Sequence, residues 1–388
     1  MNPAIRHVYV HFPYCLHRCG YCDFATTVAR VIPRERYLAQ ILTELEIRGV
    51  DQEFAPLESV FFGGGTPSLW GPQAIAAVLN WLERRAGFTE AVEITLEANP
   101  GALESGDLAA YATAGINRVS VGIQALHDAR LRALDRLHDA ESARQTLAQL
   151  ERLLAAGRLR SANADLIFGV PGQTLLDLRT DVAGILDYGL SHLSAYSLTV
   201  ESGTPLAAQV KRGLVARPDD DLQATMLDTL PDLLAPYGLT RYEVSNYARP
   251  GHASQHNLAY WTGRYYLAVG VGAHGFLPRA GAVGLRYGNT RKHEIWLRAL
   301  AQRELAEDLR ESIDLDQHQD ERLLTGLRLS AGLDLRAFAV DLGDRRREDL
   351  LRRAQSGIAR GDFWMRDEHL GVSPPALARL DRLIAELA

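Results

Sequence analysis

The 388-residue sequence has only three cysteines, and all of them lie in one run, CLHRCGYC, as Cys15, Cys19 and Cys22. Without a distant partner they cannot build the disulfide framework of a secreted protein. In a reducing compartment such thiols stay available to a metal. The scarcity and clustering of cysteine therefore favour metal or redox chemistry over cross-linking.

The sequence also lacks a long apolar run and a secretory leader. No stretch reaches the roughly 18 apolar residues of a membrane-spanning helix. The N-terminal residues, MNPAIRHVYVHFPYC, have neither the charged start nor the small-residue cleavage site of a signal peptide. These absences predict a cytoplasmic protein with no integral membrane segment.

No sign of charge dominates the chain. It has 42 basic and 48 acidic residues in mixed order, for a formal net charge of −6. Such a composition does not suit a surface that wraps nucleic acid or binds an anionic membrane. We expect a small-molecule ligand and no nucleic-acid partner.

What the sequence does have is an alternation of β-rich and helical stretches. The β-rich runs are HVYVHF, SVFFGGG, VEITLEANP, RVSVGIQ, ADLIFGVPG and HLSAYSLTVES. Alternation of this kind predicts an α/β fold, in which crossover helices join parallel strands. Six such units predict a partial (β/α)6, TIM-like barrel with its active site at the C-terminal ends of the strands.

The alternation fades beyond about Gly270, and residues 301–317 are charged without a clear strand pattern. We therefore expect residues 1–300 to form the barrel with an extension, and residues 301–388 to form a small C-terminal domain. That domain combines helical patterns with FWMRDEHLGVS, a predicted hairpin that turns at Asp367 and Glu368. This combination predicts a winged-helix-like module.

Two kinds of metal site fit the three cysteines. A closed structural zinc site would need a fourth protein ligand, for which His17 is a candidate. An iron-sulfur cube normally takes four cysteines, so three would leave one iron open. The thiolate ligands, and glycine-rich and acidic segments elsewhere in the chain, favour the iron-sulfur cube.

The cysteine spacing, with Tyr21 directly before the last cysteine, resembles the cluster loop of the radical S-adenosylmethionine (SAM) superfamily. In that superfamily the amine and carboxylate of SAM complete the open iron, so the resemblance implies a [4Fe-4S] cluster and SAM as cofactors. The run FFGGGTPS has glycines that permit close approach of the backbone. The resemblance implies SAM contacts from Tyr9, Tyr21, Gly64, Gly65, Thr66, Glu97, Gln124, Arg136 and Asp165.

The chain resembles one branch of the superfamily along essentially its whole length. The segments YVHFPYCLHRCGYCDF, GGGTPSL, LEANP, NRVSVGIQ, LDRLH and DLIFGVPGQT follow the order and spacing of that branch. It contains the oxygen-independent coproporphyrinogen III oxidases and the HemW-type heme chaperones. The resemblance therefore implies either a porphyrin-decarboxylating enzyme or a protein that carries heme.

Two features separate these alternatives. The oxidases have a further cysteine two residues after the third, where this sequence has Phe24. The run HNLAYW, which contains His256, Tyr260 and Trp261, fits the HNxxYW signature of the HemW type. A neutral imidazole can bind iron and aromatic rings can stack on a porphyrin. The resemblance thus favours a heme chaperone, with His256 as the heme ligand and a respiratory hemoprotein as a candidate acceptor.

Overall fold

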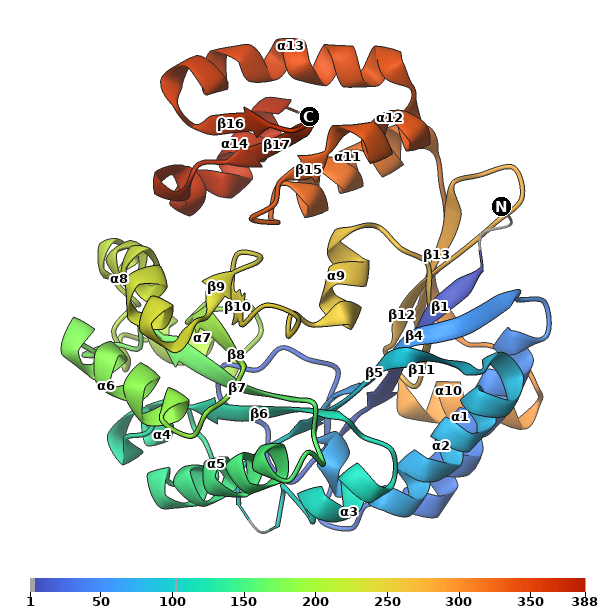
Figure 1. Ribbon diagram of the computed structural model, residues 1–388. Helices are drawn as coiled ribbons and strands as arrows, with labels where there is room; N and C mark the ends of the chain where they lie inside the picture. The colour runs from blue at the N-terminus through green and yellow to red at the C-terminus, as the bar shows by residue number, and fades with distance from the viewer. Residues whose placement is uncertain (1–3, 102, 388) are drawn as a thin grey trace.

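The computed structural model describes residues 4–101 and 103–387. Its centre is a set of six neighbouring parallel strands (Figure 1). They confirm the predicted partial (β/α)6 barrel, and each overlaps one of the β-rich runs of the sequence. In sheet order they are β1 (Ile5–Phe12), β4 (Phe54–Gly64), β5 (Phe88–Ala98), β6 (Arg118–Gln124), β7 (Ser161–Phe168) and β8 (His192–Ser197).

Helices cover the outer face of these strands. Nearby side chains fix where some of these helices begin. Asp139 caps the N-terminus of the helix that starts at Ala140, and Thr174 forms a capping box with Asp177 at the start of the helix that begins at Leu175. Among the described residues, none of the helices has both the length and the hydropathy of a membrane-spanning segment. The helices along the barrel are α1 (Arg34–Gly49), α2 (Pro72–Ala86), α3 (Leu108–Thr113), α4 (Asp128–Ala133), α5 (Ala140–Ala155), α6 (Leu175–Leu186), α7 (Pro205–Lys211) and α8 (Asp220–Leu234).

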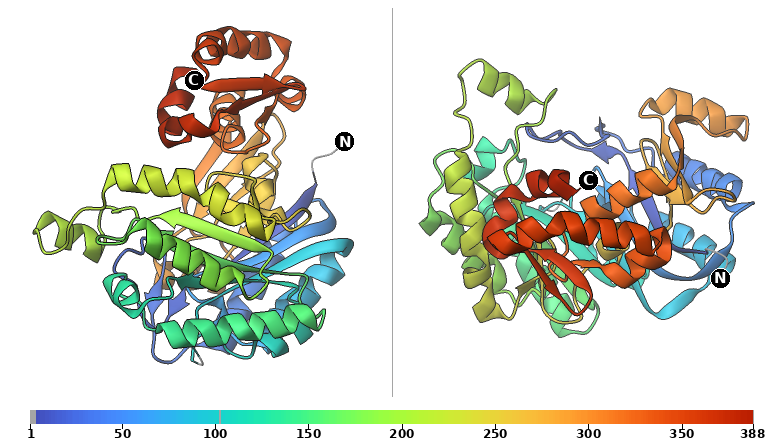
Figure 2. Two further views of the ribbon diagram at one scale, coloured as in Figure 1. Left: turned by 60° about the vertical axis from the view of Figure 1, so that its left-hand side comes forward. Right: turned by 90° about the horizontal axis from the view of Figure 1, so that it is seen from above.

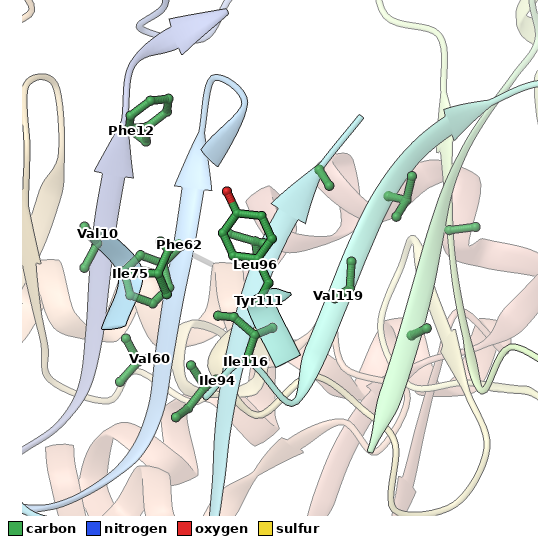
Figure 3. Packing of buried hydrophobic residues seen from close by; sticks show 14 of the residues in the cluster. Val10, Phe12, Val60, Phe62, Ile75, Ile94, Leu96, Tyr111, Ile116 and Val119 are labelled. Atoms are coloured by element: carbon green, nitrogen blue, oxygen red, sulfur yellow. The ribbon is translucent and has the colours of Figure 1, made fainter. Parts of the chain in front are cut away.

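The two-residue period of the strands separates the core from the site. Val10, Phe62 and Leu96 are fully buried and pack in one core cluster with Ile75 of α2, and Figure 3 shows these four side chains close together. Burying such a side chain contributes about 1.5–3 kcal/mol. Their neighbours in sequence point to the opposite, concave face of the sheet, and among these is Glu97. The strands therefore bury one face in the core and present polar groups on the other.

The sheet continues beyond β1 instead of closing on β8. Strand β11 (Tyr266–Val269) pairs in parallel with β1, and β12 (His274–Leu277), β13 (Gly284–Asn289) and β14 (Glu307–Ile313) follow as antiparallel neighbours. At the other edge lie β10 (Asn246–Ala248) and β9 (Thr240–Arg241). The barrel is consequently open, and the fading alternation beyond Gly270 reflects this antiparallel extension.

The first residues of the expected C-terminal domain include a strand of the main sheet. Residues 301–317 contain β14, which pairs with β13 of the main sheet and alternates between exposed and partly buried positions. Its charged outward side chains conceal the strand pattern. We therefore propose a boundary at Asp314, which caps the next helix, α11 (Leu315–Gly326).

The C-terminal module has its own apolar core, which includes Leu323, Phe338 and Leu383. The predicted hairpin turns at Asp367 and Glu368, which both have positive φ angles, of 47° and 65°. A third short strand pairs with this hairpin. The module contains α11, α12 (Leu335–Leu342), α13 (Asp344–Arg360) and α14 (Leu380–Leu387), with β15 (Leu333–Asp334), β16 (Phe363–Arg366) and β17 (His369–Val372), and Figure 2 shows it from two further sides.

Candidate functional site

The cysteines lie at the C-terminal end of β1, where the chain leaves the sheet. Cys15 ends the short strand β2 (Tyr14–Cys15), and a backbone hydrogen bond of 3.1 Å from Cys22 to Cys19 tightens the following loop. All three are free and line a single cavity of about 130 Å³. Thr66 Oγ1 donates to Cys15 Sγ at 3.5 Å, and Arg136 Nη1 donates to Cys19 Sγ at 3.4 Å. The fold thus gathers the three candidate ligands.

Unpartnered polar atoms in the same cavity show that it suits a polar cofactor. Gln124 Oε1, Arg136 Nε and Thr26 Oγ1 are buried and have no hydrogen-bond partner among the described residues. Leaving such atoms unsatisfied costs about 1–3 kcal/mol each. The backbone at Gln124 also has a φ of 63°, which non-glycine residues seldom adopt. These features fit a site that is completed by a bound group.

The three thiols do not form a single-ion site. Within the described ranges, no group of three or more His, Cys, Asp or Glu side chains is arranged to hold one metal ion. A cube presents each thiolate with a different iron, so its ligands need not meet at one point. His17, the candidate fourth ligand for zinc, instead lies 3.0 Å from Asp135 Oδ2 through its Nε2 atom.

Arg136 and Asn99 connect the cluster loop to the barrel. Arg136 Nη2 donates to Asn99 Oδ1 at 2.7 Å and to the Gly122 carbonyl at 2.9 Å. Asn99 Nδ2 in turn donates to Thr66 Oγ1 at 3.0 Å. The guanidinium is therefore held rigidly beside the thiols, where it can pair with a carboxylate.

Two acidic side chains face Arg136 across the site. Glu97 Oε2 accepts a hydrogen bond from the Gly64 amide at 3.0 Å, and Asp165 Oδ1 accepts one from Asn163 Nδ2 at 2.8 Å. Burial, and then the charge of Asp165, raises the pKa of Glu97 to about 8. Burial also raises the pKa of Asp165. Two buried carboxyls with raised pKa values favour a cationic ligand between them.

Glu97 gives a pH dependence to the stability of the cofactor-free protein. Its folded-state pKa of about 8 exceeds the ordinary glutamate value of 4.5, so the folded chain binds more protons between these values. The free energy of unfolding is therefore expected to fall as the pH rises through this interval. Glu97→Gln should flatten the decline, as measured by urea unfolding at several pH values. Glu90→Gln, at an exposed position of the same strand, is the control and should leave the decline unchanged.

A larger cavity of about 430 Å³ adjoins the cluster cavity and shares Tyr21, Glu97, Gln124 and Asp165 with it. Asn163 organises its polar wall by donating to Ser120 Oγ at 2.7 Å and to Ser194 Oγ at 2.9 Å. These three polar residues were not among those expected from the sequence motifs. The sequence feature that could have identified them is a polar residue in the middle of an otherwise apolar strand. Together the two cavities form one continuous site.

Two of the expected SAM contacts lie behind this site. The Thr66 side chain is buried against Cys15 and Asn99 and lines neither cavity. The Tyr9 hydroxyl shares a 3.0 Å hydrogen bond with His11 Nδ1, and its ring stacks on Phe61 with centroids 6.1 Å apart. Both residues support the walls, whereas Gly64, Gly65, Tyr21, Glu97, Gln124, Arg136 and Asp165 line the cluster cavity.

The structure holds His256 in a closed, hydrogen-bonded state, and its role as the heme ligand stays a prediction from the signature. His256 lies in α9 (Gln255–Trp261), is 1% exposed, and uses both ring nitrogens. Nδ1 is 2.7 Å from Ser59 Oγ and Nε2 is 2.8 Å from Tyr260 Oη. Burial lowers the pKa of the ring to about 3, so the imidazole is neutral. The histidine fastens α9 to β4, and the neighbouring Asn257 lines the larger cavity.

Comparisons with known proteins agree with this geometry. Residues 9–183 match the sequence profile of the radical SAM superfamily. The structure superposes on that of coproporphyrinogen III oxidase (HemN) from Escherichia coli with a TM-score of 0.80 and 19% identity, covering 100% of this chain and 90% of the other. The fold is therefore the radical SAM fold, and the superfamily implies a [4Fe-4S] cluster and SAM as cofactors.

Sequence relatives define the family more narrowly. The heme chaperone HemW of Mycobacterium tuberculosis is 36% identical over 357 residues, which cover 91% of this chain and 87% of that protein. HemW of Escherichia coli is 34% identical over 69% of each chain. The chain belongs to the HemW family.

The mitochondrial radical S-adenosyl methionine domain-containing protein 1 of the mouse is another relative. It is 43% identical over 277 residues, which make up 70% of this chain. The chain spans 61% of the length of that mouse protein.

Proposed function

We propose that this protein is a heme chaperone that binds heme and passes it to an acceptor hemoprotein. The observation that carries the proposal is its 32–36% identity to several proteins named heme chaperone HemW. Phe24 at the place of the oxidases' further cysteine, and the HNLAYW segment, support the same assignment. The proposed location is the cytoplasm and the proposed acceptor is a hemoprotein such as a respiratory one.

The proposed roles of the site residues follow from their chemistry. Cys15, Cys19 and Cys22 would hold the cluster, which when bound supplies an electron source and one open iron. Arg136 would pair with the carboxylate of SAM, because its guanidinium is buried and fixed beside Cys19. Glu97 and Asp165 would bind the cationic or hydroxyl groups of SAM across the cavity.

A transfer experiment tests the function directly. Anaerobically reconstituted protein is titrated with hemin, separated from free hemin, and mixed with an apo-hemoprotein. We expect a Soret band on the chaperone that moves to the acceptor with time. With SAM, a reductant and coproporphyrinogen III, we expect no protoporphyrinogen IX. Formation of that product would replace the chaperone proposal with the oxidase alternative.

A further inference from the structure

A third cavity lies outside the barrel, between the main sheet and the C-terminal module. It has a volume of about 250 Å³ and is bounded on one side by α11 and on the other by the end of α9 and strands β11 to β13. Figure 1 shows α11 next to α9 across this junction. We call it the interdomain cleft. It shares no lining residue with the cluster cavity or with the larger barrel cavity.

The barrel side of the interdomain cleft is aromatic. Tyr260, Tyr266 and Phe276 line it, and the rings of Tyr260 and Tyr266 meet edge to face with centroids 4.6 Å apart. Flat aromatic walls bury apolar ligands with large contact areas. The cleft therefore suits a planar hydrophobic group.

The module side contributes a buried histidine and a buried arginine. His318 and Arg322 are 6% and 5% exposed, and their spacing of four residues puts them on one face of α11. His318 Nδ1 and Arg322 Nε have no hydrogen-bond partner among the described residues. The other ring nitrogen, His318 Nε2, is 3.9 Å from Asp341 Oδ2, which is too far for a hydrogen bond. Arg322 Nε lies 3.7 Å from the same Asp341 oxygen. Asp341 is therefore a nearby charge partner of both groups, but it leaves His318 Nδ1 and Arg322 Nε without a hydrogen bond in the cavity wall.

Cationic side chains border the same space. Arg264 and Arg286 line the interdomain cleft together with Arg322. Arg286 is paired with Glu321 across the junction. Guanidinium groups recognise carboxylates through paired hydrogen bonds. A planar ligand that carries carboxylate groups would find partners for its ring and for its charges.

We propose that the interdomain cleft binds one edge of the heme carried by this protein, with His318 as the iron ligand and Arg264 and Arg322 as partners of the propionates. The proposal rests on the proposed heme-chaperone function. A neutral imidazole nitrogen is a common iron ligand. Because ligand sites usually measure about 300–1,000 Å³, the smaller cleft holds part of the macrocycle and leaves the rest exposed for transfer.

This location also gives the HNLAYW segment a structural role. Asn257 lines the larger barrel cavity, whereas Tyr260 lines the interdomain cleft. Between them, the His256 ring stacks on Phe61 with centroids 5.2 Å apart, and Phe61 lines the barrel cavity. The segment is the wall between the SAM side and the proposed heme side. Tyr260 and His256 are joined by a hydrogen bond, so one contact path links the two sites.

Hemin titration of the reconstituted full-length protein tests the proposal. For His318→Ala we expect a shifted Soret band and affinity reduced roughly tenfold or more, since even changes behind a metal ligand cost about 10–100-fold. Leu324→Trp should block hemin, because Leu324 lines the interdomain cleft and is 45% exposed, so the change leaves the module core intact. His369→Ala, in the hairpin of the same module, is the control and should bind hemin normally. Cluster iron content and circular dichroism confirm that each variant is folded.

A parallel titration with metal-free protoporphyrin IX separates iron ligation from binding of the ring and carboxylates. His318→Ala should bind this ligand as the wild type does, whereas Arg322→Gln should bind it more weakly. Wild-type hemin spectra in both His318→Ala and Leu324→Trp would overturn the assignment. If the Soret band shifted in His256→Gln and not in His318→Ala, the heme ligand would be assigned to His256 in α9 instead. If the wild-type protein bound no hemin, the proposed function itself would fail.

Discussion

Replacing Cys15, Cys19 and Cys22 together with alanine is expected to reduce the iron and sulfide content of the reconstituted protein to background. These are the only cysteines of the chain, and all three line one cavity, so no other thiol can take their place. Each single replacement should remove most of the iron, because a cube that has an open iron already uses all three ligands. Iron and sulfide per chain, with the visible absorption spectrum, measure the effect.

Cluster assembly should also depend on pH. Burial raises the pKa of the Cys15 thiol to about 12, so this thiol must lose a proton when it binds iron. His17→Ala provides the matched control inside the same loop, since His17 contacts Asp135 and is not required as a ligand. Wild-type iron in the triple variant would refute the cluster assignment. Loss of iron in His17→Ala would show that His17 also takes part in holding the cluster, and zinc instead of iron in the wild-type protein would return the zinc alternative.

Gly65→Val is expected to abolish SAM binding and to lower the iron content as well. From sequence alone, added bulk at this glycine should block SAM and spare the cluster. In the structure, however, a Cβ atom at Gly65 would lie 2.7 Å from the Tyr14 carbonyl oxygen and 2.9 Å from the Pro13 carbonyl group. These are backbone atoms directly before Cys15, so the clash must displace the loop that carries this ligand.

The Gly65 prediction can be checked by equilibrium SAM binding together with iron analysis. Gly20→Ala is a suitable control, because it lies between Cys19 and Cys22 and its Cβ would meet only Asp135, with Asp135 Cβ at an ordinary 3.5 Å. We expect this control to keep both cofactors. If Gly65→Val left both the SAM affinity and the iron content unchanged, the loop would accommodate the valine side chain. Gly65 would then not belong to the SAM site.

Much of the barrel and of its site is readable from local sequence. The six parallel strands have largely apolar sequences, because one face of the sheet packs against helices and the other faces the inside of the barrel. Their C-terminal ends coincide with the motifs that contain Cys15, Gly64, Glu97 and Gln124. Strand ends of a parallel sheet lie at one edge, so the sequence alone predicts that these residues lie together. The structure places them around one cavity.

Other features depend on contacts between distant segments. The strand β14 is charged and lies at the sheet edge, where one-sided burial leaves only a weak alternating pattern. Tyr9 and Thr66 belong to matching motifs, yet their side chains turn toward His11 and Cys15 rather than into the cavity. A motif specifies which residues occur, but the neighbouring elements determine where each side chain points.

The sequence by itself determined the cluster loop, the parallel barrel and the family resemblance, because these depend on short-range spacing and on the period of each strand. Only the tertiary structure decided the state of His256, since its partner Ser59 lies 197 residues away in the chain. The same holds for the interdomain cleft, where Tyr260 of α9 and His318 of α11 line one cavity although they lie far apart in the sequence. Whether a histidine is a ligand or a packed core residue depends on the groups that fold against it, and the local sequence does not contain them.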